Sequence, residues 1–429
     1  MSAATATASP SRSSTAPGIR NWGAAGTYAV LALVALVGFA LGSPAKSARF
    51  RISNDGDALF VPDIVLGTTP VGWIASLALL GLAGYAVYLT ARAERLPRWL
   101  APVFAAVFVA GFLVWVIGSA ENPNVYFSGL IAGSFTLAIP LIFGSLSGVL
   151  CERAGIVNIA IEGQLLSGAF CAALVGSITQ NVYAGVLAAV AGSIAVSVVL
   201  AVFSIKYLVN QVIVGVVLNV LVVGLTSFLF STVMQSDSAR FNSPPSFAPV
   251  RIPLLADIPI FGPIFFDQTI LGYAMYAAVL VVWFGLFKTR WGLRVRAVGE
   301  HPKAADTVGI RVNSIRFSNV VLAGVVAGIG GAFFTLVTSS SFNKEMTAGQ
   351  GFIALAALIF GRWNPIGAFF AALLFGFSLN LSFVLTILGT PVPSQFMQML
   401  PYLVTIFAVA GLAGKSRPPA ASGVPYVKE

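Results

Sequence analysis

The fold is decided where two long apolar runs meet at a short polar stretch. The apolar runs are residues 128–150 and 158–178, and residues 151–164 at their meeting point read CERAGIVNIAIEGQ. A helix needs roughly 20 apolar residues to cross a hydrocarbon core about 30 Å thick. The pattern therefore predicts two membrane-spanning helices joined by a polar turn.

Similar apolar runs along the chain predict an all-α fold, a polytopic transmembrane helical bundle of about 10–12 spans. Together with the pair above, the runs fall near residues 24–41, 70–90, 99–118, 128–150, 158–178, 183–205, 211–234, 268–287, 317–338, 351–361, 365–388 and 395–414. The run 351–361 is too short for an ordinary span. We expect it to be tilted or re-entrant, which is tolerated only where protein or a water-filled cavity surrounds the backbone.

Composition excludes a soluble protein. Hydrophobic residues make up 58% of the 429 and charged residues 9%, whereas soluble domains carry about 25% charged residues. The net charge of +10 comes from basic residues in short loops, where they set orientation and contact membrane lipid, so we expect no nucleic-acid partner. With one histidine, His301, and two isolated cysteines, Cys151 and Cys171, the sequence predicts neither a metal site nor a cofactor.

The distribution of basic residues predicts the topology. With the N-terminus inside and the spans alternating, most of the 24 Lys and Arg residues fall on the inner side, so both termini are expected in the cytoplasm of a bacterial cell (inner) membrane. Residues 1–22 read as a disordered cytoplasmic tail, residues 415–429 as a cytoplasmic C-terminal tail, and residues 235–267 as an external loop. We interpret the first run, 24–41, as an uncleaved anchor rather than a signal peptide.

The polar stretch supplies candidate solute-pathway residues. Asn158, Glu162 and Gln164, with Asn219 in the run 211–234, offer the donors and acceptors that a neutral polar solute needs. Ionisable groups at membrane depth usually have a purpose, and Gly155 and Gly163 permit a broken helix. A solvated cytoplasmic turn remains an equally good interpretation, and it is the expected one for Glu152 and Arg153.

A basic internal stretch supplies a candidate docking element. Residues 288–316 read KTRWGLRVRAVGEHPKAADTVGIRVNSIR. Pro302 is suited to the first turn of a short helix and Gly309 to its end. Such a helix can dock a cytoplasmic partner, and a solvated basic loop is the alternative.

Two glycine-containing stretches predict local packing. Gly361 and Pro365 in FGRWNPIGA (360–368) predict a tight turn between two spans. Gly324 and Gly328, with two further glycines soon after, predict a face for close helix packing. Gly414-Lys415-Ser416 is not a phosphate loop, because Val409 occupies the position of its first glycine. We therefore expect no ATPase site and no enzyme activity in this chain.

Three blocks resemble the ABC importer permeases for nucleosides and simple sugars, relatives of the branched-chain amino-acid and ribose permeases. They are IPLIF (139–143) followed by CERAGIVNIAIEG (151–163), RAVGEHPKAADTVGI (296–310), and ALAALIFG (354–361) followed by WNPIG (363–367). Where that family typically has a glycine after the Asn-Ile pair, this sequence has Ala160. The resemblance covers about residues 128–414, and the extra predicted spans in residues 23–127 depart from it.

The resemblance implies an alternating-access permease that is driven by a separate cytoplasmic ATPase. It also implies a second permease subunit and an extracytoplasmic substrate-binding protein. It places the 158–162 stretch near the translocation path and implies a role in coupling to the ATPase for the following residues: Glu300, His301, Pro302, Ala305, Asp306 and Gly309. Nucleosides are the favoured solutes. A sugar permease and an ion-coupled secondary transporter remain the alternatives.

Overall fold

The computed structural model describes residues 22–52, 62–97, 99–258, 261–389, 393–399, 402 and 417–428. Residues 1–21 of the expected tail and most of the expected span at residues 395–414 lie outside these ranges, and Trp22 is the first residue of α1. The chain divides into two compact units. The first comprises Met1–Arg49, Ile64–Asn124 and Leu388–Pro391, and the second comprises Phe50–Asp63, Val125–Ile387 and Val392–Glu429.

The first unit, called the three-helix unit here, contains three apolar helices. They are α1 (Trp22–Ala35), which continues as the π-helical turn η1 (Leu36–Leu41), α2 (Thr68–Ala91) and α3 (Leu100–Gly118), with strands β1 (Ser47–Arg51) and β2 (Ile64–Gly67). Aromatic rings cluster in its interior. The ring of Phe39 contacts those of Phe108, Phe112 and Trp115, at centroid distances of 5.3, 6.3 and 5.9 Å. Helix α2 packs closely against η1 at Gly72, where an added Cβ would lie 1.8 Å from the carbonyl oxygen of Phe39.

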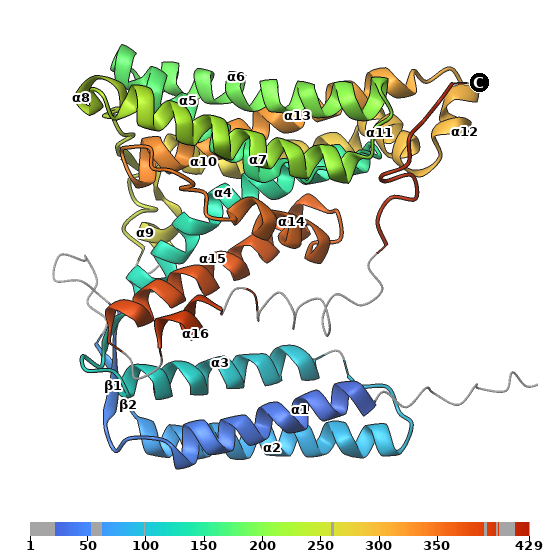
Figure 1. Ribbon diagram of the computed structural model, residues 1–429. Helices are drawn as coiled ribbons and strands as arrows, with labels where there is room; N and C mark the ends of the chain where they lie inside the picture. The colour runs from blue at the N-terminus through green and yellow to red at the C-terminus, as the bar shows by residue number, and fades with distance from the viewer. Residues whose placement is uncertain are drawn as a thin grey trace, which may run out of the picture. The chain divides into compact units, whose positions relative to one another are not determined.

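The second unit, called the core unit here, contains the remaining long helices (Figure 1). Its elements are β3 (Asn124–Tyr126), α4 (Phe127–Arg153), α5 (Ile161–Thr179), α6 (Val182–Ala201) with η2 (Val202–Lys206), α7 (Gln211–Leu229) with η3 (Phe230–Met234), α8 (Ser238–Phe241), β4 (Pro249–Arg251), α9 (Phe261–Phe265), β5 (Asp267–Thr269), α10 (Ile270–Lys288), α11 (Arg290–Glu300), α12 (Pro302–Thr307), α13 (Val312–Phe333) with η4 (Phe334–Thr338), α14 (Gln350–Phe360), α15 (Pro365–Ile387) and α16 (Ser394–Gln398). Strands β4 and β5 pair antiparallel, with Val250 opposite Gln268.

The predicted fold class is confirmed. In the described ranges, ten helices are long and apolar enough to cross a membrane, and they coincide with ten of the twelve predicted runs. Helix α14, at 11 residues, matches the short run 351–361. The run 395–414 falls mainly on residues outside the description.

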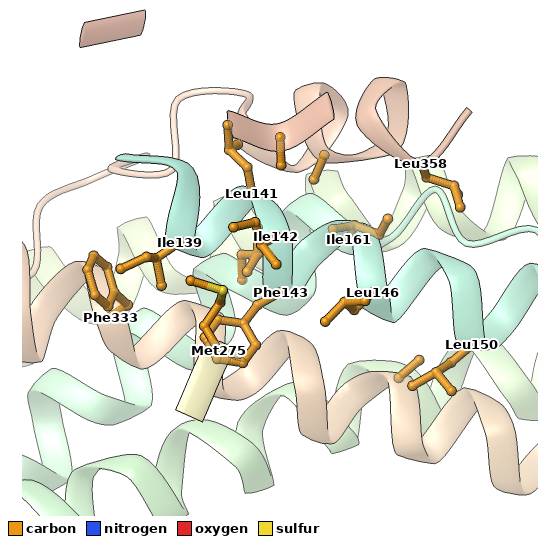
Figure 2. Close-up of a cluster of buried hydrophobic side chains, with 14 of the residues drawn as sticks. Ile139, Leu141, Ile142, Phe143, Leu146, Leu150, Ile161, Met275, Phe333 and Leu358 are labelled. Atoms are coloured by element: carbon orange, nitrogen blue, oxygen red, sulfur yellow. The ribbon is translucent and has the colours of Figure 1, made fainter. Parts of the chain in front are cut away.

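Helix α4 lies at the centre of the core unit, packed on both sides by other helices. Its side chains Ile139, Ile142 and Phe143 face Phe333 of α13 and Met275 of α10 (Figure 2). Lipid is as apolar as these side chains, so the association depends on close fit rather than on a hydrophobic driving force.

Glycines in α13 supply that close fit. A Cβ at Gly324 would lie 2.3 Å from Ser197 Oγ, one at Gly328 would lie 2.7 Å from Val190 Cα, and one at Gly331 would lie 2.4 Å from the carbonyl oxygen of Leu165. The predicted small-residue face is thus confirmed as an intramolecular packing surface against α5 and α6.

Candidate functional site

The chain between α4 and α5, residues 154–160, folds back into the core unit. Ile161 packs against Gly144 and Gly148 of α4, where added Cβ atoms would lie 3.2 and 3.3 Å from its side chain. These glycines precede the end of α4 at Arg153 by five to nine residues, so α5 begins about 10 Å inward from that end. This segment, the α4–α5 junction, is therefore a re-entrant connection and not a solvated turn.

Two of the predicted pathway residues join in a buried amide network. Asn158 donates from Nδ2 to Oε1 of Gln164 (3.0 Å) and to Oγ of Ser147 (3.3 Å). Gln164 donates from Nε2 to Oγ of Ser197 (2.8 Å). None of these four side chains has exposed surface, so the network ties α4, α5, α6 and the junction together from inside.

Asn219 of α7 holds the junction from the other side. Its Oδ1 accepts from the backbone N–H of Gly163 (2.8 Å), and its Nδ2 donates to the carbonyl oxygen of Ile159 (2.8 Å). About two turns earlier in α7, Gln211 accepts through Oε1 from the N–H of Val157 (2.7 Å). The structure therefore brings all the predicted pathway residues to the junction.

Glu162 caps a helix that lies far away in sequence. Its Oε1 accepts from Oγ1 of Thr347 (2.6 Å) and from the N–H of Gly349 (2.9 Å), and its Oε2 accepts from the N–H of Gly351 (2.6 Å). A carboxylate at this position satisfies free N–H groups of the first turn of α14 and complements the positive end of its dipole. The close approach requires glycine, because a Cβ at Gly351 would lie 2.4 Å from the nitrogen of Glu162.

Residues 339–361, called the interrupted crossing here, run along α5 in the direction opposite to it. Phe342 stacks edge-on against Phe170 in the middle of α5 (centroids 5.2 Å apart), and Thr347 reaches Glu162 at its first turn. Helix α14 then continues to the end of α4. Residues 339–349 are irregular, with positive φ at Ser340, Glu345, Ala348 and Gly349. The run 351–361 is thus the helical half of one crossing.

The turn after α14 locks onto the end of α4. As predicted, Gly361 closes α14, directly after its last residue Phe360, and α15 begins at Pro365. Trp363 donates from Nε1 to the carboxylate of Glu152, and Arg153 donates from Nε to the carbonyl oxygen of Trp363 (2.9 Å). Glu152 is 5% exposed, so the prediction that it is solvated was wrong. Its partner lies 211 residues away, beyond the reach of local sequence patterns.

The basic stretch 288–316 forms two helices rather than one. Thr289 caps α11 by accepting from the N–H of Gly292 (3.1 Å), and Pro302 occupies the first turn of α12, as predicted. The chain turns after α12 at Gly309, where φ is +84°. Helix α11 was missed because its arginines suggested a loop, although Val295 and Val298 give it a buried apolar face.

Of the predicted ATPase-coupling residues, Glu300, His301 and Gly309 are exposed, and Pro302 and Asp306 are half-buried. Around α12, Lys303, Ala304, Thr307 and Val308 are exposed as well. Ala305 points inward and is 4% exposed. Glu300, Asp306 and Gly309 lie on the same part of the chain, at the end of the core helices where Figure 1 shows α11 and α12.

Residues 417–428, called the C-terminal segment here, pack against this end of the core unit. The N–H of Ala421 donates to the carbonyl oxygen of Gly299 (2.9 Å), and the N–H of Gly423 donates to that of Gly155 (3.2 Å). Tyr426 is buried in a cluster with Val298 of α11 and Val312 of α13. The segment therefore connects α11 and α13 to the α4–α5 junction.

Charged groups on the predicted docking element also contact the C-terminal segment. Glu300 accepts through Oε2 from the N–H of Ala420 (3.1 Å), and Asp306 Oδ1 lies 3.9 Å from Nζ of Lys428. Arg316, 2% exposed, donates from Nη1 to the carbonyl oxygen of Val424 (2.9 Å). The acids at positions 300 and 306 thus face another part of this chain.

Sequence reasoning missed Thr347, Trp363 and the C-terminal segment. The two side chains stand beside glycine or proline turns, which gave a signal for a turn but none for its partner. Pro418, Pro419 and Gly423 are typical of a linker, whereas Ala421 and Tyr426 are buried in the structure. Among the described residues, no cluster of three or more His, Cys, Asp or Glu side chains is placed to hold a metal ion.

Comparison with known proteins identifies the family. A family model described as "Branched-chain amino acid transport system / permease component" matches residues 130–409. The chain is 40% identical to the nucleoside ABC transporter permease protein NupC of Lactococcus lactis and 39% identical to the guanosine ABC transporter permease protein NupQ of Bacillus subtilis. Each alignment covers 70% of this chain and 96% of the relative.

A third relative is named for a different solute. The chain is 34% identical to the putative glucose ABC transporter permease protein TsgC13 of Haloferax volcanii, over 65% of this chain and 90% of the relative. No solved structure matches the chain. The match to the family model, the two relatives near 40% identity and the ten apolar helices show that this chain is a multi-pass membrane protein of the ABC transporter permease family.

Proposed function

We propose that this chain is the membrane-spanning subunit of an ATP-driven importer for nucleosides in a bacterial cell membrane. The observation that carries the proposal is the identity of about 40% to two permeases named for nucleoside and guanosine transport. In both cases the chain aligns with 96% of the relative's length. A separate ATPase subunit supplies the energy, and an extracytoplasmic binding protein and a second permease subunit complete the transporter.

The end of the core unit that carries α11 and α12 is assigned to the cytoplasm. Basic residues gather there, including Arg290, Arg294 and Lys303, and basic residues mark the cytoplasmic side of membrane proteins. The ATPase docks on the exposed side of α12, where His301, Ala304 and Val308 are exposed.

Alternating access follows from the way α12 connects to the junction. Movement of α12 and α11 shifts the C-terminal segment, which is hydrogen-bonded to Gly155 at the start of the junction. Asn158 of the junction is hydrogen-bonded to Gln164 of α5, and Glu162 on the first turn of α5 in turn holds α14. The ATPase changes the balance between inward and outward states only by binding the two with different affinity.

A sugar importer is the second candidate, favoured by the 34% identity to the putative glucose permease. The nucleoside importer and the sugar importer share the fold, the ATPase and the docking element. They differ only in the solute, so competition between solutes separates them.

The test is uptake of radiolabelled guanosine, adenosine and glucose in cells that lack this chain, with and without its restoration. Cellular ATP is depleted in one arm while the proton gradient is held. We expect guanosine uptake that needs both this chain and ATP. Uptake that follows the gradient and ignores ATP would indicate an ion-coupled transporter instead, and ATP-dependent uptake of glucose alone would move the assignment to sugars.

A further inference from the structure

The interrupted crossing exposes polar side chains within the length of a membrane-spanning helix. Phe342 and Thr347 have no exposed surface, while Asn343, Lys344 and Glu345 between them are exposed. Phe342 contacts Phe170, and Thr347 contacts Glu162. The exposed polar residues therefore lie between levels of α5 that are eight residues, or about 12 Å, apart.

This stretch does not suit lipid. Irregular backbone facing lipid would leave N–H and C=O groups without partners, and charged side chains at this depth are expensive unless they meet water or protein. The exposed side chains of α7 show what a lipid-facing surface of this chain looks like, since Val216, Val217, Val220 and Leu221 are all apolar. The exposed part of the crossing has the opposite character.

We propose that residues 343–352 of the interrupted crossing line the solute path of the assembled transporter, and that the solute they contact is a nucleoside. The identity of the solute rests on the proposed function. The placement of the path rests on the geometry of the crossing and stands apart from it.

The side chains on this stretch suit a nucleoside. Phe352 is 49% exposed and presents a ring on which a base can stack. Two amides accompany it, Asn343 and Gln350, and amides pair with base edges and ribose hydroxyls. Gln350 Oε1 is buried and has no hydrogen-bond partner within the described ranges, which leaves an acceptor for a group that the chain itself does not supply.

The start of α14 fixes these groups in place. Glu162 accepts from the N–H groups of Gly349 and Gly351, on either side of Gln350. Phe352 follows directly, and its ring carbon Cδ2 lies 4.0 Å from where a Cβ of Gly349 would stand. Glu162 is thus a positioning residue, which holds the solute-contacting stretch without needing to touch the solute.

Cysteine labelling tests whether residues 343–352 are accessible to water. Asn343→Cys in the assembled transporter is treated with a charged, membrane-impermeant thiosulfonate reagent, with Val220→Cys on α7 as the matched control, since Val220 is 69% exposed on an apolar surface. The wild-type chain reports the background from Cys171, which is half-buried. We expect Asn343→Cys to react at least tenfold faster than the control and to be protected by saturating guanosine.

Equal rates for the two variants would overturn the placement of the path, and wild-type uptake of guanosine would be unaffected by that result. Fast labelling that glucose blocks and guanosine does not would overturn the solute class together with the proposed nucleoside import. Glu345→Cys repeats the measurement if Asn343→Cys does not assemble.

The kinetics of guanosine uptake test whether the ring of Phe352 contacts the solute. Loss of a stacked aromatic side chain weakens binding of a base by about 5- to 150-fold, so Phe352→Ala should raise the KM for guanosine within that range. Phe352→Trp should keep the KM near its wild-type value, because tryptophan also offers a ring on which the base can stack. Phe370→Ala is the control, since Phe370 is 64% exposed on α15. An unchanged KM in Phe352→Ala would remove the ring from the proposed path.

Discussion

The three-helix unit and the core unit bury different kinds of side chain. In the three-helix unit the interior is aromatic, built around Phe39, and its helices have between 28% and 39% of their span residues buried. In the core unit the outer spans α6, α7 and α10 are also 33% buried, but α4 and α5 reach 67% and 72%, and amides and carboxylates lie among their apolar neighbours. Buried polar groups need partners in fixed positions. The buried amides and carboxylates with fixed partners are therefore found in the core unit, around α4 and α5.

The largest expected effect comes from Glu162→Ala. The change leaves three donors on and before α14 without an acceptor, at a cost of about 1–3 kcal/mol for each buried donor. We expect uptake to fall at least tenfold while the ATPase remains bound in a pull-down. Ser76→Ala is the matched change in the three-helix unit, where the lost bond is that to the carbonyl oxygen of Ala35, and uptake there should be nearly normal. Wild-type uptake in Glu162→Ala would remove its positioning role.

Gly351→Ala should have the next largest effect, because its Cβ would lie 2.4 Å from the nitrogen of Glu162 and the backbone of α5 or α14 must move. The comparison is Gly84→Ala in α2, where an added Cβ meets nothing within 4 Å. Uptake and thermal stability of the purified complex are measured for both. We expect a severe loss for the first and no loss for the second, and similar behaviour of the pair would contradict the close approach.

Tyr426→Ala tests the C-terminal segment. Removal of a buried aromatic ring costs about 3–5 kcal/mol in protein cores, enough to release the segment from α11 and α13. Uptake should fall several-fold while ATP hydrolysis by the complex continues and loses its response to the loaded binding protein. Val427→Ala, at a position 61% exposed, should behave as wild type. Increased uptake in Tyr426→Ala would instead indicate that the segment inhibits the transporter.

Glu300→Ala and Asp306→Ala should have smaller effects of the same kind. Each loses a contact with the C-terminal segment near the surface, and such contacts contribute about 1 kcal/mol or less. We expect partial uncoupling, seen as a lower number of guanosine molecules imported per ATP hydrolysed, with normal membrane insertion. Normal coupling in both variants would remove these acids from the coupling path.

Phe39→Ala should have the smallest effect on transport. It opens a cavity among the rings of the three-helix unit and lowers its packing energy by roughly 3 kcal/mol. Protease sensitivity of α1 and α2 should rise, while uptake changes by less than about twofold. A large loss of uptake would show that the three-helix unit participates in transport and would blur the contrast between the units.

The spans could be predicted from sequence because each is a local run of apolar residues. The short run 351–361 even predicted an unusual crossing. What could not be predicted is the partner of each polar group, because Glu162 meets Thr347 across 185 residues and Glu152 meets Trp363 across 211. Helix α11 was within reach, since Thr289 is a capping residue and Val295 and Val298 have helical spacing.

Asn158, Glu162 and Gln164 stand close together in the sequence, but their hydrogen-bond partners and the position of Asn219 beside them could not be predicted. Asn158 and Gln164 bond inward to each other, which a linear pattern cannot distinguish from bonding to a solute. The exposed polar residues of the crossing, such as Asn343, follow no motif, and their meaning depends on the depth at which α5 holds them.

The C-terminal segment also determines when this protein can finish folding. The guanidinium of Arg316 is bonded to a carbonyl oxygen 108 residues later in the chain. At a synthesis rate of about 5–20 residues per second, α13 is complete roughly 5–20 s before that acceptor exists. During this interval Arg316 must be hydrated or held by lipid headgroups. The packing of α11 and α13 against the C-terminal segment is therefore completed only after the spans preceding the segment have been made.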